Sequence, residues 1–152
     1  MKKLLILLFS ILISFNSYGL FGLFEKTVCV ETDAQERGGI YYLPNETKPF
    51  TGKNLCKYEN GQIKQEANYK DGKKDGKETE WYKNGQKFAE GNMKDGKLDG
   101  KWTTWYEDGQ IQSYGIYKND KQDGKVTWWN KNGQIRFERT YKNGVCISGD
   151  CD

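Results

Sequence analysis

The sequence predicts an all-β fold, an elongated single-layer antiparallel β-meander built from 24-residue hairpin repeats. Three observations predict it: a turn tripeptide that recurs in strict register, a second glycine turn within each repeat, and runs of strand length between the turns. Asn-Gly and Asp-Gly supply the positive φ angles that a tight hairpin turn requires. Because the connections are this short, each strand is expected to pair antiparallel with the strand beside it in sequence.

The repeat keeps a constant period of 24 residues without insertions. Its turn tripeptide, Asn/Asp-Gly-Gln, begins at Asn60, Asn84, Asp108 and Asn132. A constant period of this length marks stacked supersecondary units, none of which can bury its apolar side alone. The array spans residues 58–145, and residues 39–57 are predicted to form a degenerate opening repeat.

Each repeat contributes two strands, such as residues 62–69 and 77–82 of the first copy. Side chains alternate along a strand, so one tryptophan of each full repeat lies on a common face. This tryptophan column consists of Trp81, Trp105 and Trp129. A column of small residues on the longer strands, which leaves room for a tryptophan of the adjoining strand, consists of Ala67, Gly91 and Gly115. The tryptophan column is therefore predicted to be core, with a platform for ligand stacking as the alternative.

Four other aromatic residues are the candidate binding residues, because the alternation places them on the face opposite the tryptophan column. They are Tyr82, Trp102, Tyr106 and Trp128. Partly exposed Trp and Tyr side chains favour contacts with other proteins. Aromatic faces also stack on sugar rings, so both kinds of ligand fit this face.

The acidic residues of the repeats have structural explanations. Glu66, Glu90 and Glu138 occupy one repeated position, which favours cross-strand ion pairs with Lys or Arg. The aspartates of the glycine turns, such as Asp71 and Asp75, lack the dense series of oxygen ligands found in a calcium loop. Asp is common in such turns for backbone reasons. Neither a metal site nor a cofactor is predicted.

The composition excludes most catalytic chemistry, because the chain contains no histidine and places no serine beside a base. Catalytic residues are therefore not predicted, and the protein is not expected to be an enzyme. Lys and Arg number 24 against 21 Asp and Glu, and without residues 1–19, which hold two lysines and no acid, the count is 22 against 21. Interleaved charges that balance this closely argue against a nucleic-acid partner.

The first nineteen residues have the layout of a secretory signal peptide. Met1-Lys2-Lys3 is followed by an apolar run over residues 4–13, and Ser17 and Gly19 are the small residues of a cleavage site after Gly19. The run is shorter than the roughly 20 apolar residues that span a bilayer. We therefore expect an exported protein, periplasmic or extracellular, whose N-terminal mature segment is residues 20–38.

All four cysteines lie after residue 19, in the expected mature protein. Export would place them in an oxidising compartment, where disulfides persist. Three pairings are possible in principle. About eight strands at ~4.8 Å spacing separate the two ends of the array, whereas a disulfide joins Cα atoms roughly 4.4 to 6.8 Å apart. Unless the sheet closes on itself, the predicted bridges are therefore Cys29–Cys56 and Cys146–Cys151, the second within a C-terminal cap of residues 146–152.

The repeat unit itself, as in residues 82–105, resembles the bacterial variant of the MORN repeat, which occurs in many exported proteins and in the YwqK-like group described as antitoxins. The resemblance covers roughly residues 40–145. It implies a single antiparallel sheet used for protein contact or, in some eukaryotic members, lipid contact, and it implies no catalytic residues. Two departures stand out, namely Asn119-Asp120 in place of an Asp-Gly turn and Asn130 in place of a tyrosine.

Together these observations favour an exported, non-enzymatic repeat scaffold that binds another exported protein, with antitoxin-like neutralisation as one form of that binding. Carbohydrate or envelope-polymer binding is the alternative, supported by the candidate aromatic face. Membrane-surface contact is a third class, and the near-neutral charge supports it poorly.

Overall fold

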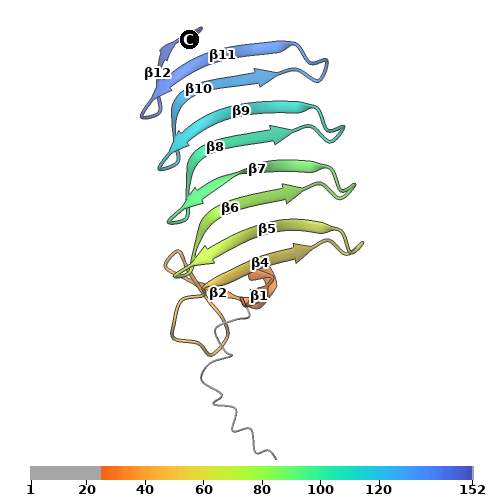
Figure 1. Cartoon of the computed structure of the whole chain (residues 1–152), viewed down its shortest axis with the longest axis vertical. Helices are drawn as coiled ribbons and strands as arrows, with labels where there is room; N and C mark the ends of the chain where they lie inside the picture. The colour runs from red at the N-terminus through yellow and green to blue at the C-terminus, as the bar shows by residue number, and fades with distance from the viewer. Residues whose placement is uncertain (1–24, 152) are drawn as a thin grey trace, which may run out of the picture.

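The computed structural model describes residues 25–151 and has the all-β meander that the sequence predicts (Figure 1). Ten strands form one sheet in the order β1-β4-β5-β6-β7-β8-β9-β10-β11-β12, and β2 and β3 form a separate hairpin. From β4 onward each strand pairs antiparallel with the next, and β1 and β12 lie at opposite edges. The sheet is therefore open, and the expected signal peptide, residues 1–19, lies outside the described residues.

The repeat array consists of strands of eight or nine residues, flanked by shorter ones. The strands of the large sheet after β1 are β4 (Gly52–Lys57), β5 (Ile63–Lys70), β6 (Lys73–Trp81), β7 (Lys87–Lys94), β8 (Lys97–Trp105), β9 (Ile111–Lys118), β10 (Lys121–Trp129), β11 (Ile135–Lys142) and β12 (Val145–Ser148). The N-terminal elements are β1 (Thr27–Val28), α1 (Val30–Asp33), β2 (Gln35–Arg37) and β3 (Ile40–Tyr42). Of the predicted opening repeat, only β4 joins the large sheet, because β3 pairs with β2.

Successive repeats are tied together at the Asn/Asp-Gly-Gln turns. The hydroxyl of Tyr58 donates a hydrogen bond of 2.6 Å to the carbonyl oxygen of Trp81 in the next repeat. Tyr82 and Tyr106 make the same contact with Trp105 and Trp129, at 2.8 and 2.7 Å. One tyrosine in each of the first three repeats thus joins two neighbouring turns.

The turns at the other edge are stacked by backbone hydrogen bonds, such as the one from the Gly96 amide to the Lys74 carbonyl. Where the third copy has Asn119-Asp120 instead of Asp-Gly, both residues adopt positive φ, 49° and 65°. Asn and Asp tolerate this region better than other non-glycine residues. The Asp120 carboxylate also accepts a 2.7 Å hydrogen bond from the Leu98 amide, which joins this turn to the repeat before it.

The structure corrects the predicted packing of the tryptophan column. Gly91 and Gly115 both pair with Trp102, and cross-strand partners lie on the same face. The small residues therefore make room for Trp102, whereas Trp105 lies on the other face with Thr103 and is half-buried. In the strands equivalent to β8, Glu78 and Val126 occupy the place of Trp102, and each is 1% exposed.

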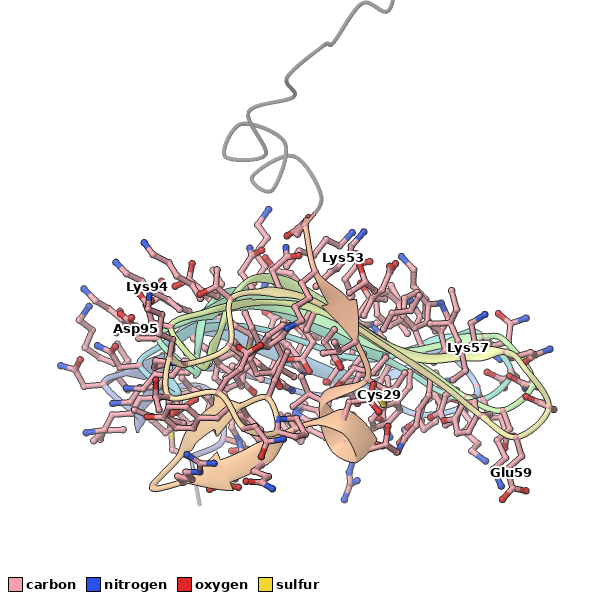
Figure 2. All side chains as sticks on the ribbon, turned by 90° about the horizontal axis from the view of Figure 1, so that it is seen from below. Cys29, Lys53, Lys57, Glu59, Lys94 and Asp95 are labelled. Carbon is pink, nitrogen blue, oxygen red and sulfur yellow. A yellow bond between two sulfur atoms is a disulfide. The ribbon has the colours of Figure 1, made fainter. Side chains whose placement is uncertain are left out.

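The two faces of the sheet differ in what covers them. We call the face that carries Trp102 the cap face, because the N-terminal elements pack on it, and the opposite face the outer face. Figure 2 shows α1 and the β2-β3 hairpin on one side of the sheet and Lys53 projecting from the other. Val30, Leu43 and Phe50 of the N-terminal part form the main hydrophobic cluster with Ala67 and Tyr69 of β5.

Both predicted disulfides are present, one at each end of the sheet. Cys29 and Cys56 join the N-terminal elements to β4 with a Cα–Cα distance of 4.6 Å. Cys146 and Cys151 close a short loop after β12 with a Cα–Cα distance of 5.7 Å. The described cysteines thus secure the two ends of the repeat array, where a solenoid lacks a neighbouring repeat.

The repeated glutamates form the cross-strand ion pairs that the sequence predicts. On the outer face Glu90 lies 3.0 Å from the Lys77 ammonium, and Glu138 lies 2.7 Å from that of Lys125. Glu66 lies farther, 4.0 Å, from Lys53. The pairs recur in three of the four repeats, because each Lys follows a glycine at the same repeated position; in the third repeat Tyr114 takes the place of the glutamate.

The close approach at Gly91 generates a stability prediction. A Cβ atom on Gly91 would lie 2.3 Å from Cε3 of Trp102 and 2.4 Å from the Lys101 carbonyl oxygen, which is backbone and cannot rotate away. At Gly115 the nearest atoms belong to side chains, at 3.0 Å or more. Gly91→Ala should therefore lower the free energy of unfolding by about 1 to 3 kcal/mol, and Gly115→Ala by less. Chemical denaturation of both variants measures this, and an equal or reversed order would contradict the packing.

The ion pairs of Glu90 generate a pH prediction. Hydrogen bonding to Lys87 is the main cause that lowers the pKa of Glu90 below its ordinary value of 4.5. A lowered folded-state pKa stabilises the fold above the unfolded pKa, and this contribution is lost as pH falls through the folded value. At neutral pH, Glu90→Gln should therefore reduce the free energy of unfolding by less than about 1 kcal/mol, since the pair is partly solvated. The difference from the parent should shrink as pH falls below 4.5 and vanish once Glu90 is protonated in the folded state as well; a difference that does not shrink in acid would contradict the assignment.

Candidate binding face

The described residues contain one group with the spacing of a metal site, Cys29, Glu31 and Cys56. The two sulfur atoms of this group are bonded to each other, so they are not thiolate ligands. No helix within residues 25–151 is long and apolar enough to cross a membrane.

Trp102 and Trp128 both lie on the cap face. Trp102 lies between Gly91 of β7 and Gly115 of β9. Trp128 of β10 pairs with Ser113, and on its other side its ring stacks on Phe137 of β11, with centroids 5.9 Å apart and planes 29° apart. The predicted location of these two tryptophans, opposite the column of Trp105, is the one that the register gives.

Tyr82 and Tyr106 directly follow β6 and β8, beside the Asn/Asp-Gly-Gln turns, rather than in the middle of the face. Their hydroxyl groups are used in the hydrogen bonds between repeats, so each holds the backbone of the next turn. The ring of Tyr82 also meets Phe88 edge to face, with centroids 5.1 Å apart. These two tyrosines therefore have a structural role that the sequence analysis did not assign to them.

The cap face carries further aromatic residues that the sequence analysis missed as binding candidates. With Trp102 and Trp128 they form what we call the aromatic strip, which consists of Trp102, Tyr117, Trp128, Phe137 and Tyr141. All five are partly exposed. The two-residue turn at Asp71-Gly72 is the signal that could have found them. Pairs counted outward from this turn place Tyr69 opposite Lys74. Odd-numbered residues of β5 therefore share a face with even-numbered residues of β6.

The N-terminal elements cover only the first part of the cap face. Their hydrophobic cluster reaches Tyr69 of β5, whereas the aromatic strip begins on β8 (Figure 1). Tyr69 itself is 5% exposed, and Tyr41 and Phe50 each lie with their ring centroids 5.7 Å from its ring. Tyr117 and Tyr141, which lie two and three repeats farther along the chain, are only half-buried.

A chain of polar side chains fixes the N-terminal elements to the sheet. The Val30 amide donates to Oδ1 of Asn54 at 2.8 Å, and Nδ2 of Asn54 donates to Oε1 of Gln65 at 2.7 Å. Nε2 of Gln65 in turn donates to Oε1 of Glu78 at 2.8 Å. Burial raises the pKa of Glu78, while its ion pair with Lys74 opposes that shift. Asn54 is fully buried, so its satisfied hydrogen bonds also specify the docked position of α1.

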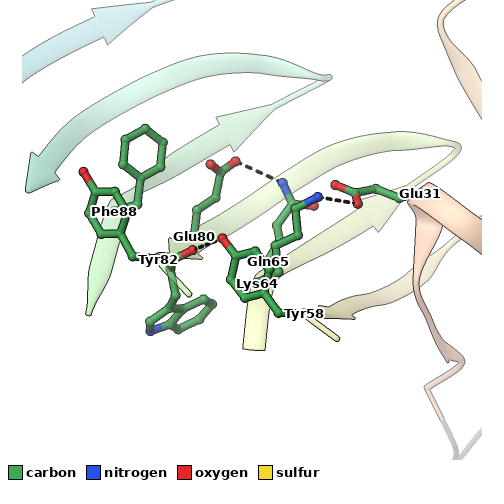
Figure 3. Close-up of a pocket in the computed structure, with 8 residues that line it drawn as sticks. Glu31, Tyr58, Lys64, Gln65, Glu80, Tyr82 and Phe88 are labelled. Carbon is green, nitrogen blue, oxygen red and sulfur yellow. Dashed lines mark hydrogen bonds and ion pairs between the residues drawn. The ribbon is translucent and has the colours of Figure 1, made fainter. Parts of the chain in front are cut away.

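Beside α1 the cap face is hollowed into a cavity of about 320 Å³ (Figure 3). On the α1 side, Glu31 and Lys64 form an ion pair of 2.6 Å, and this hydrogen bond raises the pKa of Lys64. On the opposite side lie the rings of Tyr82 and Phe88. Glu80 lies between these sides, and its carboxylate accepts a 3.0 Å hydrogen bond from Gln65, which is neutral.

Arg139 adds positive charge to the far end of the aromatic strip. Its Cζ lies 4.7 Å from the centroid of the Phe137 ring. Its Nε is buried and has no hydrogen-bond acceptor among the described residues. In β5, β7 and β9 the same position is a small residue, Ala67, Gly91 or Gly115. Among these equivalent strands, only β11 therefore carries a guanidinium there.

The tyrosine bonds between repeats generate a stability prediction. Tyr106→Phe leaves the Trp129 carbonyl without its 2.7 Å donor and should lower the free energy of unfolding by about 0.5 to 1.5 kcal/mol. Tyr141→Phe is the matched control, since the Tyr141 hydroxyl makes no hydrogen bond to a described residue. Thermal unfolding of the two variants measures the difference, and equal melting shifts would show that the tyrosine bond contributes little.

Comparison with known proteins agrees with this architecture. The family model described as MORN repeat variant matches four consecutive segments, residues 50–71, 74–95, 98–119 and 122–143. Each segment covers one strand and the strand that follows it, such as β6 and β7, which is the unit that the structure repeats. No curated protein matches the chain. The four segments together cover more than half of the sequence, and the chain belongs to the MORN repeat variant family.

Proposed function

We propose that this protein is a non-enzymatic scaffold that binds another exported protein, and that the partner lies along the aromatic strip of the cap face. The observation that carries the proposal is the strip itself, five partly exposed aromatic side chains in register on one face. Aromatic side chains bury large areas at a modest entropy cost and dominate the energetics of protein interfaces. A single-layer sheet has no second layer of its own to cover such a strip.

The N-terminal elements supply an intramolecular precedent. This segment of the same chain lies on the cap face and buries Val30 and Leu43 against Ala67 and Tyr69. The positions of Ala67 and Tyr69 recur farther along as Gly115 and Tyr117, where no described segment covers them. A partner segment with apolar side chains would find a surface of the same construction as the one that already holds the cap.

The cysteines support an exported setting for this binding. Two disulfides are typical of an oxidising location outside the cytosol. A partner in the same compartment is therefore expected, and the predicted signal peptide agrees with that expectation. Antitoxin-like neutralisation of a toxin is one form that the binding takes under this proposal.

Carbohydrate binding is the second candidate, and one observation favours it. The stacked pair of Trp128 and Phe137 presents a flat aromatic surface of the kind that sugar rings stack on. Arg139 beside the pair offers hydrogen-bond donors for hydroxyl or carboxylate groups of an envelope polymer.

The test compares two double variants of the immobilised, disulfide-bonded protein. Replacing Trp128 and Phe137 by Gln alters the aromatic strip, whereas replacing Trp129 and Ile135 by Gln alters the outer face at the same two strands. Under the proposal, the variant altered at Trp128 and Phe137 retains at least tenfold less of an envelope protein than the parent does. A loss of this size is the usual effect of removing an interface hot spot. The outer-face pair keeps parental retention.

Three outcomes would overturn the proposal. Equal retention by both double variants would place the interface elsewhere. Strip-dependent retention on purified envelope glycan, with no protein retained, would replace protein binding by the carbohydrate alternative. Strip-dependent binding to liposomes alone would replace it by membrane contact. Circular dichroism melting of each variant before the assay ensures that only folded protein is compared.

A further inference from the structure

A lysine lies over the turn tyrosine of two repeats. The Lys83 ammonium lies 6.0 Å from the centroid of the Tyr58 ring, and the Lys131 ammonium lies 5.8 Å from that of Tyr106. In both cases the lysine follows its tyrosine by 25 residues. A cation over the face of an aromatic ring is attracted by the ring quadrupole, so these contacts are a repeated feature of this turn edge.

The turn tyrosine between them, Tyr82, is the exception. The residue 25 positions after it is Glu107, an acid where the other two repeats have lysine. Desolvation, followed by the nearby charges of Glu107 and Asp108, raises the pKa of the Tyr82 phenol. The ring that the repeat pattern pairs with a cation therefore has acids beside it instead.

Tyr82 also lines the cavity beside α1, together with Tyr58, whose ring already has Lys83 over it (Figure 3). Of the two carboxylates in the cavity wall, that of Glu31 is paired with Lys64. Glu80 has a neutral hydrogen-bond donor, Gln65, and no ion pair with a described residue. The cavity wall thus carries two carboxylates and the single ammonium of Lys64, which leaves a net negative charge. The rings of Tyr82 and Phe88 in the same wall meet edge to face.

We propose that this cavity binds a basic side chain of the partner protein, its cationic group lying against the Tyr82 ring and its charge balanced by Glu80. The proposal rests on the proposed function, because it adds a specificity site to the cap face that the partner contacts. Such a side chain provides the cation that Glu107 fails to provide. Its aliphatic stem fits the apolar ring edges, as lysine stems do elsewhere on proteins.

The other repeats lack this combination, which makes the site unique within the array. At the position of Glu80, β8 has Thr104 and β10 has Trp128. At the positions of Lys64 and Gln65, β7 has Phe88 and Ala89. The α1 wall is present only at the first repeat, so the cavity forms where the cap ends. One basic residue of the partner would therefore fix the position of the bound segment on the repeats.

The experiment uses the ¹⁵N-labelled, disulfide-bonded protein and a small probe, α-N-acetyl-L-lysine N-methylamide. Saturable amide shifts at Tyr82 and Phe88 are expected at millimolar probe concentration. The norleucine analogue lacks the ammonium group, so the affinity obtained from its shifts should be at least threefold weaker. Glu80→Gln should weaken lysine-probe binding by roughly threefold or more, while the matched variant Glu66→Gln on the outer face should leave it unchanged.

A fourth variant distinguishes this site from a merely acidic surface. Glu107→Lys restores the lysine of the repeat pattern and should reduce binding of the probe, because an internal cation then lies over Tyr82. Absence of saturable shifts, equal affinity for the norleucine analogue, or unchanged binding in Glu80→Gln would each overturn the inference. These measurements involve no residue of the aromatic strip, so their failure leaves the retention test of the proposed function independent.

Discussion

The structure depends on one constraint: among residues 25–151, no second layer covers the sheet beyond its first strands. An ordinary sheet buries one face against helices or another sheet, but most strands here have only their two neighbours. Burial must then come from side chains of adjacent strands lying over one another, which is why the same position recurs every 24 residues. The 2.3 Å that a Cβ on Gly91 would have to Trp102 shows how closely one such pair approaches. Turns, ion pairs and tyrosine bonds follow the same step because the strands that carry them do.

The ends of the array, where this mutual covering stops, are treated differently from its middle. At the first repeat a segment of the same chain crosses the cap face and is fixed by a disulfide, a buried asparagine and a hydrophobic cluster. At the last repeat the sheet ends with the short strand β12 and a local disulfide, and Val145 and Ile147 remain largely exposed. Within residues 25–151 the cap face is thus covered at one end only, and the aromatic strip lies on the part that no described segment covers.

The sequence was enough to predict the architecture, since strict periodicity and two-residue turns leave few alternatives to an open meander. The cysteine pairing followed from the distance between the ends of that meander. The core assignment was wrong, because alternation was read along each strand without counting pairs across the turn, so Ala67 was grouped with Trp81 although it pairs with Glu78. The cavity beside α1 could not be predicted. It depends on where a segment without repeat character, residues 25–38, crosses the sheet, and on contacts such as that between Glu31 and Lys64, 33 residues apart.

Trp128 and Trp129 are adjacent in sequence and lie on opposite faces, so they report directly on which face is used. Hydroxyl-radical footprinting of the disulfide-bonded protein, alone and with its purified partner, measures the oxidation of each residue by mass spectrometry. The account predicts that the partner protects Trp128, together with Phe137, and leaves Trp129 oxidised as in the free protein. Protection of Trp129 with Trp128 unchanged would contradict it, because the partner would then lie on the outer face.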